Sequence, residues 1–419
     1  MISEFNHVSS FKTPFFFYDF DKVHDNIRRF SYFPKSMNVE LFYAMKANDY
    51  PPLLTFLKQK GIHIEVASGL ELQMAQKVGF DKIVFNGPAK TNEELELAAK
   101  SKNTTILIDS LNELETLQKI VSAKTHIGIR INPFSSTWSK FGIHKKNIKI
   151  ALEQIASSKN LELAGFHFHA GSFIHDPLFY KHLLNQLITI IKTSPIHYFN
   201  SITFINIGGG MPCYGKIKRN TLEGLLAKGP IKNFLSESFI RSQELQHMKH
   251  FEKLDLNQWF KSFAVIISIY MSRIETLLQK KVKLYLEPGT SLIGDAVNVY
   301  AQAVTTKYNK VLLDVGSNIE YDHNNFWHPI YNITSPSDDI QKANVFGPLC
   351  ARDDLFARCY FGKPLKKGDY VKIISMGAYT FSLHTSFIKS RLGVVIKKNN
   401  TIKQTVTGET FENKYSSFF

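Results

Sequence analysis

Eight short apolar runs alternate with amphipathic stretches from residue 40 onward, and this alternation limits the possible folds more than any other feature of the chain. The runs predict β-strands over Glu40–Met45, Ile62–Ala67, Lys82–Phe85, Thr104–Ile108, His126–Ile131, Leu163–Phe168, Ile202–Ile207 and Val282–Leu286. The stretches between them predict helices such as Pro51–Lys60, Gly69–Val78, Asn92–Lys100 and Leu111–Val121. Strand, helix and strand at this spacing require crossover connections and therefore a parallel sheet. Eight such units predict an α/β fold, a (β/α)8 barrel.

The remainder of the chain differs in character. Residues 298–419 alternate apolar and polar side chains with a period of two, and turn signals separate the runs. The sequence therefore predicts a barrel over 25–297 and a mainly-β domain over 298–419, which residues 1–24 join through a strand at Phe15–Tyr18. The polar stretch 216–262 is interpreted as an excursion between the seventh and eighth strands.

Composition excludes several classes of protein. A chain with 44% hydrophobic and 21% charged residues can bury a large core, and it lacks a run long enough to span a membrane or to act as a secretion signal. Its three cysteines are too few and too scattered for a disulfide framework, which indicates a reducing, cytoplasmic setting. The net charge of +15 is dispersed without a nucleic-acid-binding signature, so neither a nucleic acid nor a membrane is expected as a partner.

Polar or glycine residues follow each predicted strand. They are Lys46, Glu65 with Ser68, Asn86, Asp109, Arg130, His169, the Gly208–Gly210 triplet and Glu287. Because the carboxyl ends of barrel strands share one mouth, where active sites form, we expect these residues to lie together. Strands often end in polar residues without any function, but a set that includes Lys, Arg, His and Glu favours a polar active site.

Three of these features together suggest pyridoxal 5′-phosphate (PLP) as the cofactor. Lys46 rises from an apolar strand, which favours imine chemistry, although a lysine that merely reaches solvent has the same pattern. The Gly208–Gly210 triplet either offers backbone amides to a phosphate or forms only a tight turn. A carboxylate such as Glu287 against the pyridine nitrogen would make the PLP ring an electron sink.

His167 and His169 lie two residues apart on one predicted strand, so their side chains point the same way. One interpretation places His169 against the PLP ring and Ser172 near its phosphate. A metal pair is the alternative, but the spacing provides no third ligand, so no metal site is predicted.

With these motifs in view, the chain resembles the diaminopimelate/ornithine decarboxylase family, in which an alanine-racemase-like barrel of PLP fold type III precedes a β domain. The resemblance runs from about Thr13 to Ser382 and rests on several short motifs in a fixed order. They are Tyr43–Asn48, Glu65–Ser68, Ser139–Ile143, the His-x-His-x-Gly-Ser run at 167–172, Gly208–Gly210, Glu287–Gly289, Gly347–Cys350 and Gly377–Tyr379. It implies a PLP-dependent carboxy-lyase that decarboxylates an amino acid.

The resemblance also implies which residues hold the cofactor. They are Lys46, Arg130, His169, Ser172, Gly208, Gly209, Gly210, Glu287 and Tyr379. In this assignment Lys46 bonds to the cofactor, His169 stacks on its ring, and Tyr379 helps to hold the phosphate. Cys350 is similar to the family cysteine that comes from the partner subunit and returns a proton to Cα, which implies a homodimer with shared active sites. Taken alone, Cys350 could equally be an inert buried thiol.

Departures from the family pattern concern the substrate. Diaminopimelate decarboxylases continue the Glu-Pro-Gly run with an arginine that binds the distal carboxylate, whereas this chain has Thr290. His328 replaces a second family arginine, while Tyr331 is kept. Ala351 replaces the acidic residue that holds a distal ammonium, and a buried ammonium without a carboxylate is costly. A free distal amine, and meso-diaminopimelate in particular, are therefore not expected.

These departures favour a substrate whose distal nitrogen is already acylated. Siderophore decarboxylases acting on citryl-amino acids are similar in the run Asp354–Arg358, so the leading hypothesis is decarboxylation of N-citryl-ornithine or a citryl-diaminopropionate in carboxylate siderophore biosynthesis. The predicted substrate residues are Thr290, His328, Tyr331, Arg352 and Asp354. Arg352, with His328 or a nearby lysine, would bind the citryl carboxylates, unless Arg352 is only a surface residue. The alternatives are a decarboxylase of free ornithine, lysine or diaminopimelate, a decarboxylase of carrier-protein-linked aminoacyl groups, a racemase, and an inactive member that acts as a binding regulator.

Overall fold

The computed structural model describes residues 7–133, 139–169, 171–215, 217–218, 237–250, 254–320, 326–351 and 353–416. These residues form two compact units. The barrel unit comprises the described parts of Arg28–Pro212 and Leu256–Gly289, and the sheet unit comprises those of Met1–Ile27, Cys213–Asp255 and Thr290–Phe419. No helix among the described residues is both long enough and apolar enough to cross a bilayer.

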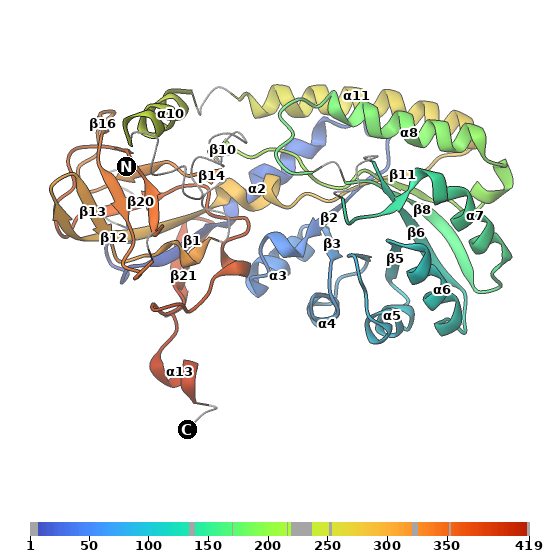
Figure 1. Cartoon of the computed structure of the whole chain (residues 1–419), viewed down its shortest axis with the longest axis horizontal. Helices are drawn as coiled ribbons and strands as arrows, with labels where there is room; N and C mark the ends of the chain where they lie inside the picture. The colour runs from blue at the N-terminus through green and yellow to red at the C-terminus, as the bar shows by residue number, and fades with distance from the viewer. Residues whose placement is uncertain are drawn as a thin grey trace. The chain divides into compact units, whose positions relative to one another are not determined.

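A closed ring of parallel strands forms the barrel unit (Figure 1). The ring consists of β2 (Val39–Ala44), β3 (His63–Val66), β4 (Ile83–Asn86), β5 (Thr104–Ile108), β6 (Thr125–Asn132), β8 (Leu161–His167), β9 (Phe204–Asn206) and β11 (Lys283–Leu286). Each strand pairs with the next along the chain, and β11 pairs with β2 to close the ring, all in parallel. The short β7 (Ile143–His144) adds to β6. The predicted eight-stranded barrel is therefore confirmed.

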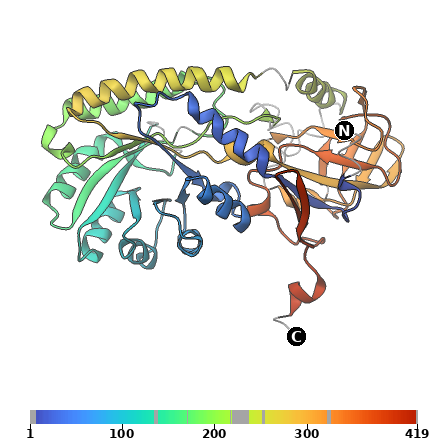
Figure 2. The ribbon, with the colours of Figure 1, turned by 180° about the vertical axis from the view of Figure 1, so that it is seen from behind.

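Helices connect the barrel strands and cover them from outside. They are α3 (Pro51–Gln59), α4 (Gly69–Val78), α5 (Asn92–Ala99), α6 (Leu111–Ile120), α7 (Ile148–Ser157), α8 (Phe179–Thr193) and α11 (Leu256–Leu278). Figure 2 shows that the two longest, α8 and α11, lie side by side. The sequence fixes several helix starts: the Thr91 side chain accepts the Glu94 amide while the Glu94 carboxylate accepts the Thr91 amide, a capping box that begins α5.

Aromatic side chains fill the barrel interior. Phe204 stacks on Tyr285 with ring centroids 4.5 Å apart, and Phe42 contacts Tyr285 at 4.4 Å. A Cβ atom at Gly165 would lie 2.5 Å from the Phe204 carbonyl oxygen, and one at Gly128 would lie 2.5 Å from a Leu107 methyl. The two glycines therefore make room for the rings, which is how three large aromatics fit inside a narrow ring of strands.

The sheet unit is built on an 11-stranded sheet among the described residues. Its strands are β1 (Phe15–Asp19), β12 (Val297–Lys307), β13 (Lys310–Leu313), β15 (Ile330–Asn332), β16 (Ile340–Gln341), β17 (Asn344–Phe346), β18 (Leu355–Ala357), β19 (Tyr360–Phe361), β20 (Tyr370–Ile373), β21 (Gly393–Lys398) and β22 (Thr401–Val406). The mainly-β character predicted for the C-terminal part is confirmed. The N-terminal strand β1 lies between β12, to which it is antiparallel, and β21, to which it is parallel.

The smaller elements of the sheet unit include β10 (Ile217–Lys218) paired with β14 (Phe326–Trp327), and the helices α2 (Phe20–Arg28), α10 (Glu237–His250), α12 (Thr290–Ile293) and α13 (Phe411–Tyr415). Helix α10 lies within the predicted excursion 216–262. Its Glu244 carboxylate accepts bonds from the Arg358 guanidinium at 2.9 Å and from the Arg358 backbone amide at 2.7 Å. The described excursion ends earlier than predicted, because Leu256 already begins the barrel helix α11.

Candidate functional site

The carboxyl ends of the barrel strands bring together a cluster of polar residues, of which all but His167 and Asn206 are predicted at the mouth from the sequence. These are Lys46, in the short 3-10 helix Met45–Ala47 that follows β2, Glu65 on β3, Asn86 on β4, Arg130 on β6, His167 on β8, Asn206 on β9 and Glu287 directly after β11. Except for the partly exposed Lys46, all of these side chains are buried. Parallel strands in one ring account for the clustering, since their carboxyl ends share one face.

Lys46 and Glu65 form a direct ion pair at the mouth. The Lys46 Nζ lies 3.0 Å from each carboxylate oxygen of Glu65. The Lys46 side chain is 39% exposed, whereas that of Glu65 is 0% exposed. Burial raises the pKa of Glu65 to about 7, and the charge of Glu287 adds to this rise while Lys46 opposes it. The Lys46 amino group is thus partly accessible to solvent. It contacts the buried Glu65 carboxylate, which gains a proton near neutral pH.

Glu287 lies in a network of donors. Asn206 Nδ2 donates to Oε1 at 2.7 Å, and His167 Nε2 lies 3.2 Å from Oε2. Asn86 Nδ2 also donates to Oε2, at 3.4 Å. Burial acts to raise the pKa of Glu287, but the His167 ring and the Lys46 ammonium lower it overall, to about 2. A buried side chain at the mouth therefore stays negatively charged at neutral pH.

Burial lowers the pKa of both histidines of the predicted pair. Burial lowers the pKa of His169 to about 3, and the Lys46 charge lowers it further; burial also lowers the pKa of His167. His169 Nδ1 accepts the Gly209 amide at 3.4 Å, and His167 Nε2 faces Glu287. Within the described ranges, no group of three or more His, Cys, Asp and Glu residues is arranged to hold a metal ion.

The Gly208–Gly210 triplet follows β9 and requires glycine. Gly208 and Gly210 have φ angles of +70° and +101°, and a Cβ atom on Gly208 would lie 2.4 Å from the Phe168 carbonyl oxygen. A Cβ atom on Gly209 would lie 2.5 Å from the Glu287 carbonyl oxygen. The expectation of bare amides is met only in part, because the Gly208 amide donates to Asn206 Oδ1 at 2.9 Å and the Gly209 amide to His169. Ser172 is exposed.

Arg130 is the predicted site residue on β6. Its Nη1 atom donates to Asn86 Oδ1 at 3.1 Å and lies 3.5 Å from Asp109 Oδ1, and the guanidinium carbon is 4.5 Å from the Phe141 ring centroid. Asn86, in turn, donates to Glu287. Arg130 therefore belongs to the same polar network as Glu287 without touching it.

The remaining predicted site residues lie in the sheet unit. Thr290 begins α12 and is buried, and Tyr331 stacks on Phe361 with ring centroids 4.8 Å apart. Both ring nitrogens of His328 are engaged: Nδ1 donates to the Ile374 carbonyl oxygen at 3.0 Å, and Nε2 lies 2.8 Å from Glu320 Oε1. The expected contact of His328 with a substrate carboxylate would therefore require this buried pair to break.

Cys350 and Asp354 share one loop between β17 and β18. Cys350 is exposed, whereas Cys213 and Cys359 are buried. Asp354 is buried, and its two oxygens accept the backbone amides of Ser317 and Leu349, each at 2.7 Å. This places Asp354 as the anchor of the Cys350 loop and leaves its predicted contact with substrate without support. Arg352, the predicted partner of a substrate carboxylate, lies outside the described residues, and Tyr379 lies in the sheet unit with a φ of +62°.

Three residues of the mouth were not predicted as site residues: Glu65, Asn206 and His167 in its contact with Glu287. Glu65 ends a predicted strand beside Ser68, which was a signal for its place at the mouth but not for its contact with Lys46. Asn206 lies inside the apolar run before the glycine triplet, where a lone asparagine between Ile205 and Ile207 was the available clue. A polar residue at a buried strand end needs a partner, and here Glu287 is that partner.

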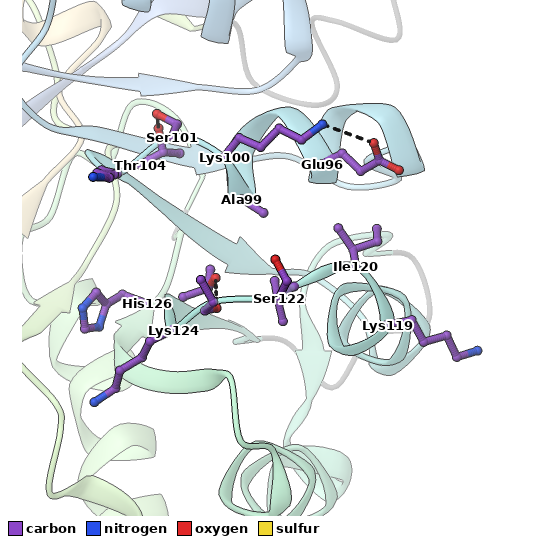
Figure 3. Close-up of a pocket in the computed structure, with 14 residues that line it drawn as sticks. Glu96, Ala99, Lys100, Ser101, Thr104, Lys119, Ile120, Ser122, Lys124 and His126 are labelled. Carbon is purple, nitrogen blue, oxygen red and sulfur yellow. Dashed lines mark hydrogen bonds and ion pairs between the residues drawn. The ribbon is translucent and has the colours of Figure 1, made fainter.

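A pocket of about 830 Å³ opens at the opposite end of the barrel strands (Figure 3). Its lining comes from the segments that precede β5 and β6, and includes Lys100, Lys102, Lys119 and Lys124. Lys100 Nζ lies 3.6 Å from Glu96 Oε2. Figure 3 shows this pair and shows the Lys119 side chain directed away from the pocket. The helices α5 and α6 end here, so the lysines compensate the negative helix termini. The amino ends of barrel strands contribute to stability rather than to catalysis.

Two family models match the chain. The model described as "Pyridoxal-dependent decarboxylase, pyridoxal binding domain" matches residues 22–236, and the one described as "Pyridoxal-dependent decarboxylase, C-terminal sheet domain" matches residues 296–377. Diaminopimelate decarboxylase of Aquifex aeolicus is 26% identical over 427 residues, which cover 96% of this chain and 91% of the relative.

Solved structures share the fold over almost the whole chain. Diaminopimelate decarboxylase from Helicobacter pylori complexed with L-lysine has a TM-score of 0.79 at 24% identity, and the match covers 99% of this chain and 98% of that one. Lysine decarboxylase from Selenomonas ruminantium has a TM-score of 0.73 at 23% identity, with 99% and 97% covered. These likenesses show a barrel followed by a β domain.

Proposed function

Because the chain belongs to the family of pyridoxal-dependent decarboxylases, which are PLP-dependent carboxy-lyases, we propose that it removes the α-carboxylate of a diamino acid at the barrel mouth. The observation that carries the proposal is the arrangement of an accessible Lys46 over Glu65 beside the buried, ionised Glu287. A lysine for the aldehyde and a carboxylate for the pyridine nitrogen are a recurrent pair of groups in PLP sites.

The residues of the mouth fit PLP. The aldehyde needs a reachable amine, and Lys46 is the partly exposed amine of the mouth. The pyridine nitrogen needs a carboxylate that remains ionised, and the donors around Glu287 keep it so. The phosphate needs close backbone approach, and the φ angles and tight contacts of Gly208 and Gly210 admit no side chain. We assign Ser172 and Arg130 to the same cofactor site, whereas the role of Tyr379, which lies in the sheet unit, rests on the resemblance alone.

When bound, PLP supplies an electron sink for the pair of electrons left at Cα as CO₂ departs. The protein's own groups do the rest. Glu287 holds a proton on the ring nitrogen, and Asn206 and His167 hold Glu287 in place. His169, neutral and next to the glycine triplet, offers a flat uncharged face to the cofactor ring.

We further propose that Cys350 returns the proton to Cα in a homodimer whose partner supplies it. Its exposure and the anchoring of its loop by Asp354 support a role in which the thiol meets a second chain. A thiol is a competent general acid near neutral pH, and a reducing cytoplasm would keep the thiol reduced. Replacement of Cys350 with Ala should slow or misdirect turnover while PLP stays bound.

For the substrate we favour a free diamino acid of the lysine, ornithine or diaminopimelate type. The names of the relatives support it, since the Aquifex aeolicus relative is a diaminopimelate decarboxylase and the Selenomonas ruminantium structure is a lysine decarboxylase. The contact between His328 and Glu320 also removes one of the groups on which a larger anionic substrate would depend.

A second candidate is a citryl-diamino acid of carboxylate siderophore biosynthesis. Thr290 and Ala351 favour it, because neither provides the charge that a free distal carboxylate or ammonium would need. Arg352 would then bind the citryl carboxylates.

Release of CO₂ from a panel of substrates separates these proposals. The panel contains free lysine, ornithine and diaminopimelate, citryl-ornithine and citryl-diaminopropionate, and an aminoacyl carrier protein, with each enantiomer assayed separately. Turnover of the free amino acids supports the first candidate, and turnover of the citryl compounds alone replaces it with the second. Loss of the lysine-bound PLP absorbance in Lys46→Ala is expected. A band and activity that survived this change would refute the cofactor site, and no turnover of any compound by PLP-loaded protein would indicate a binding regulator.

A further inference from the structure

Glu65 has no role in the chemistry described so far, yet its carboxylate is in direct contact with the reactive lysine. Both of its oxygens lie 3.0 Å from Lys46 Nζ. Its position on β3 is fixed, because Glu65 pairs with Ala44 on β2 and with Val84 on β4 in the parallel ladder. The Glu65 side chain is 0% exposed, whereas that of Lys46 is 39% exposed.

The other carboxylates near Lys46 are committed elsewhere. Glu287 is surrounded by Asn206, His167 and Asn86. Glu71 is within electrostatic reach of Lys46, but its Oε2 atom accepts the Ala67 amide at 2.6 Å in the turn that begins α4. Glu65 is the carboxylate in direct contact with Nζ among the described residues.

Glu65 and Glu287 also differ in their readiness to take a proton. The mouth lowers the pKa of Glu287 to about 2, while burial raises that of Glu65 to about 7. A proton that leaves an amine in this mouth near neutral pH therefore goes to Glu65 and not to Glu287. Two carboxylates whose pKa values are shifted in opposite directions beside one amine are typical of paired acid and base roles.

We infer that Glu65 positions the Lys46 amino group at the mouth and accepts the proton that this ammonium must lose before its nitrogen can bond to an aldehyde carbon. The inference rests on the proposed function. In the step, one proton moves from Nζ to a Glu65 oxygen, and the freed electron pair of Nζ forms the bond to the aldehyde carbon. The aldehyde oxygen leaves as water with the two protons that remain on Nζ. No oxidant or further reactant is needed.

The test follows bond formation rather than turnover. Full-length protein freed of cofactor is mixed with PLP between pH 6 and 8.5, the reaction is quenched with borohydride at set times, and the modified Lys46 peptide is quantified by mass spectrometry. We expect Glu65→Gln to slow labelling by at least about 10-fold near neutral pH, within the range of a lost general base. The wild-type rate should bend where Glu65 titrates, and the bend should be absent in Glu65→Gln and retained, at a shifted pH, in Glu65→Asp.

Glu40→Gln is the matched control, because Glu40 is a lysine-paired carboxylate on β2 at the other end of the barrel. It should label at the wild-type rate. A Glu65→Gln rate equal to or above the wild-type rate would overturn the inference, since removal of a mere counter-ion would leave the amine more nucleophilic. Wild-type protein in which PLP does not modify Lys46 would instead overturn the proposed function. If Glu65→Gln fails to fold, the pH profile of Glu65→Asp decides: a wild-type profile refutes the inference, and a shifted bend supports it.

Discussion

Removal of the Asp354 carboxylate should release the loop that carries Cys350. The carboxylate joins two segments of the sheet unit, since one oxygen accepts the Ser317 amide and the other the Leu349 amide, both at 2.7 Å. The same loop is closed by the Gly347 amide, which donates to the Asp354 carbonyl oxygen at 3.0 Å. Cys350 follows Leu349 directly, so the second carboxylate bond fixes the backbone next to the thiol.

The magnitude follows from the bonds lost. A buried hydrogen bond to a charged group contributes about 1.5–3 kcal/mol, and Asp354→Ala leaves each amide without its acceptor. Since about 1.4 kcal/mol corresponds to a factor of ten, each amide should exchange its hydrogen roughly 10- to 100-fold faster if the loop opens locally. Asp354→Asn keeps one oxygen and turns the other into a donor, so it should speed exchange mainly at one of the two amides.

Hydrogen–deuterium exchange with fragment-level resolution measures both sites. Asp339→Ala serves as the control, because Asp339 is an exposed acid of the same unit whose carboxylate accepts the hydroxyl of Ser337, two residues away. Equal exchange rates at Ser317 and Leu349 in wild-type and Asp354→Ala protein would refute the anchoring role and restore Asp354 as a candidate substrate contact. If the alanine variant unfolds, Asp354→Asn decides instead: faster exchange at one of the two amides supports the anchoring role, and unchanged exchange at both refutes it.

Three further predictions concern stability. Burial raises the pKa of Glu65, so the stability that its protonated form gives is present at low pH and is lost as pH rises through about 7; the unfolding free energy of wild type relative to Glu65→Gln should therefore fall between pH 5 and 8 in urea titrations. Hydrogen bonds from Lys283 and Lys82 lower the pKa of Glu40 against its burial, so wild type should lose its advantage over Glu40→Gln as pH falls below about 4.5 in the same titrations. Arg358→Ala removes the guanidinium that pairs with the buried Glu244 carboxylate and should cost about 3–5 kcal/mol in chemical unfolding. Arg358→Met with Glu244→Met should recover most of this loss, and a double variant as unstable as the single one would contradict the prediction.

The fold could be predicted because its signal is repetitive and local. Each predicted barrel strand overlaps an observed one, and Gly69–Val78 is an observed helix with the predicted bounds, since Ser68 caps its start and Gly79, with a φ of +80°, ends it. The bounds of the stretch 216–262 were predicted less well, because that prediction used polar composition rather than periodicity. The stretch 216–262 was interpreted as one polar excursion, but the amphipathic pattern of α11 begins inside it, at Leu256. Polar composition and helical periodicity overlapped there, and packing against α8 decided the outcome.

The site could be predicted in its location more than in its contacts. Strand ends identified Lys46 and Glu287, because a parallel barrel fixes which residues share the mouth. The same reasoning treated His328 and Asp354 as free for a substrate, since a sequence does not reveal which polar side chains a fold uses for itself. His328 pairs with Glu320, eight residues earlier, and Asp354 accepts the amide of Ser317, 37 residues earlier. Pairings over such separations depend on the folded sheet and leave no local pattern.

The two ends of strand β2 match lysines with carboxylates in different ways, and this difference supports the role proposed for Lys46 and Glu65. At the amino end, Glu40 accepts bonds from both Lys82 and Lys283, so two ammonium groups share one carboxylate, whose pKa is lowered overall. At the carboxyl end, one ammonium, Lys46, serves two carboxylates, which cannot both be neutralised by it. The second arrangement forces one carboxylate toward protonation while the other stays ionised, which is the condition for moving a proton near neutral pH. The number of ammonium groups per carboxylate, more than the residue types, therefore distinguishes the mouth from an ordinary ion-pair cluster. This number is not evident from the sequence, because the groups come together only when the ring of strands closes.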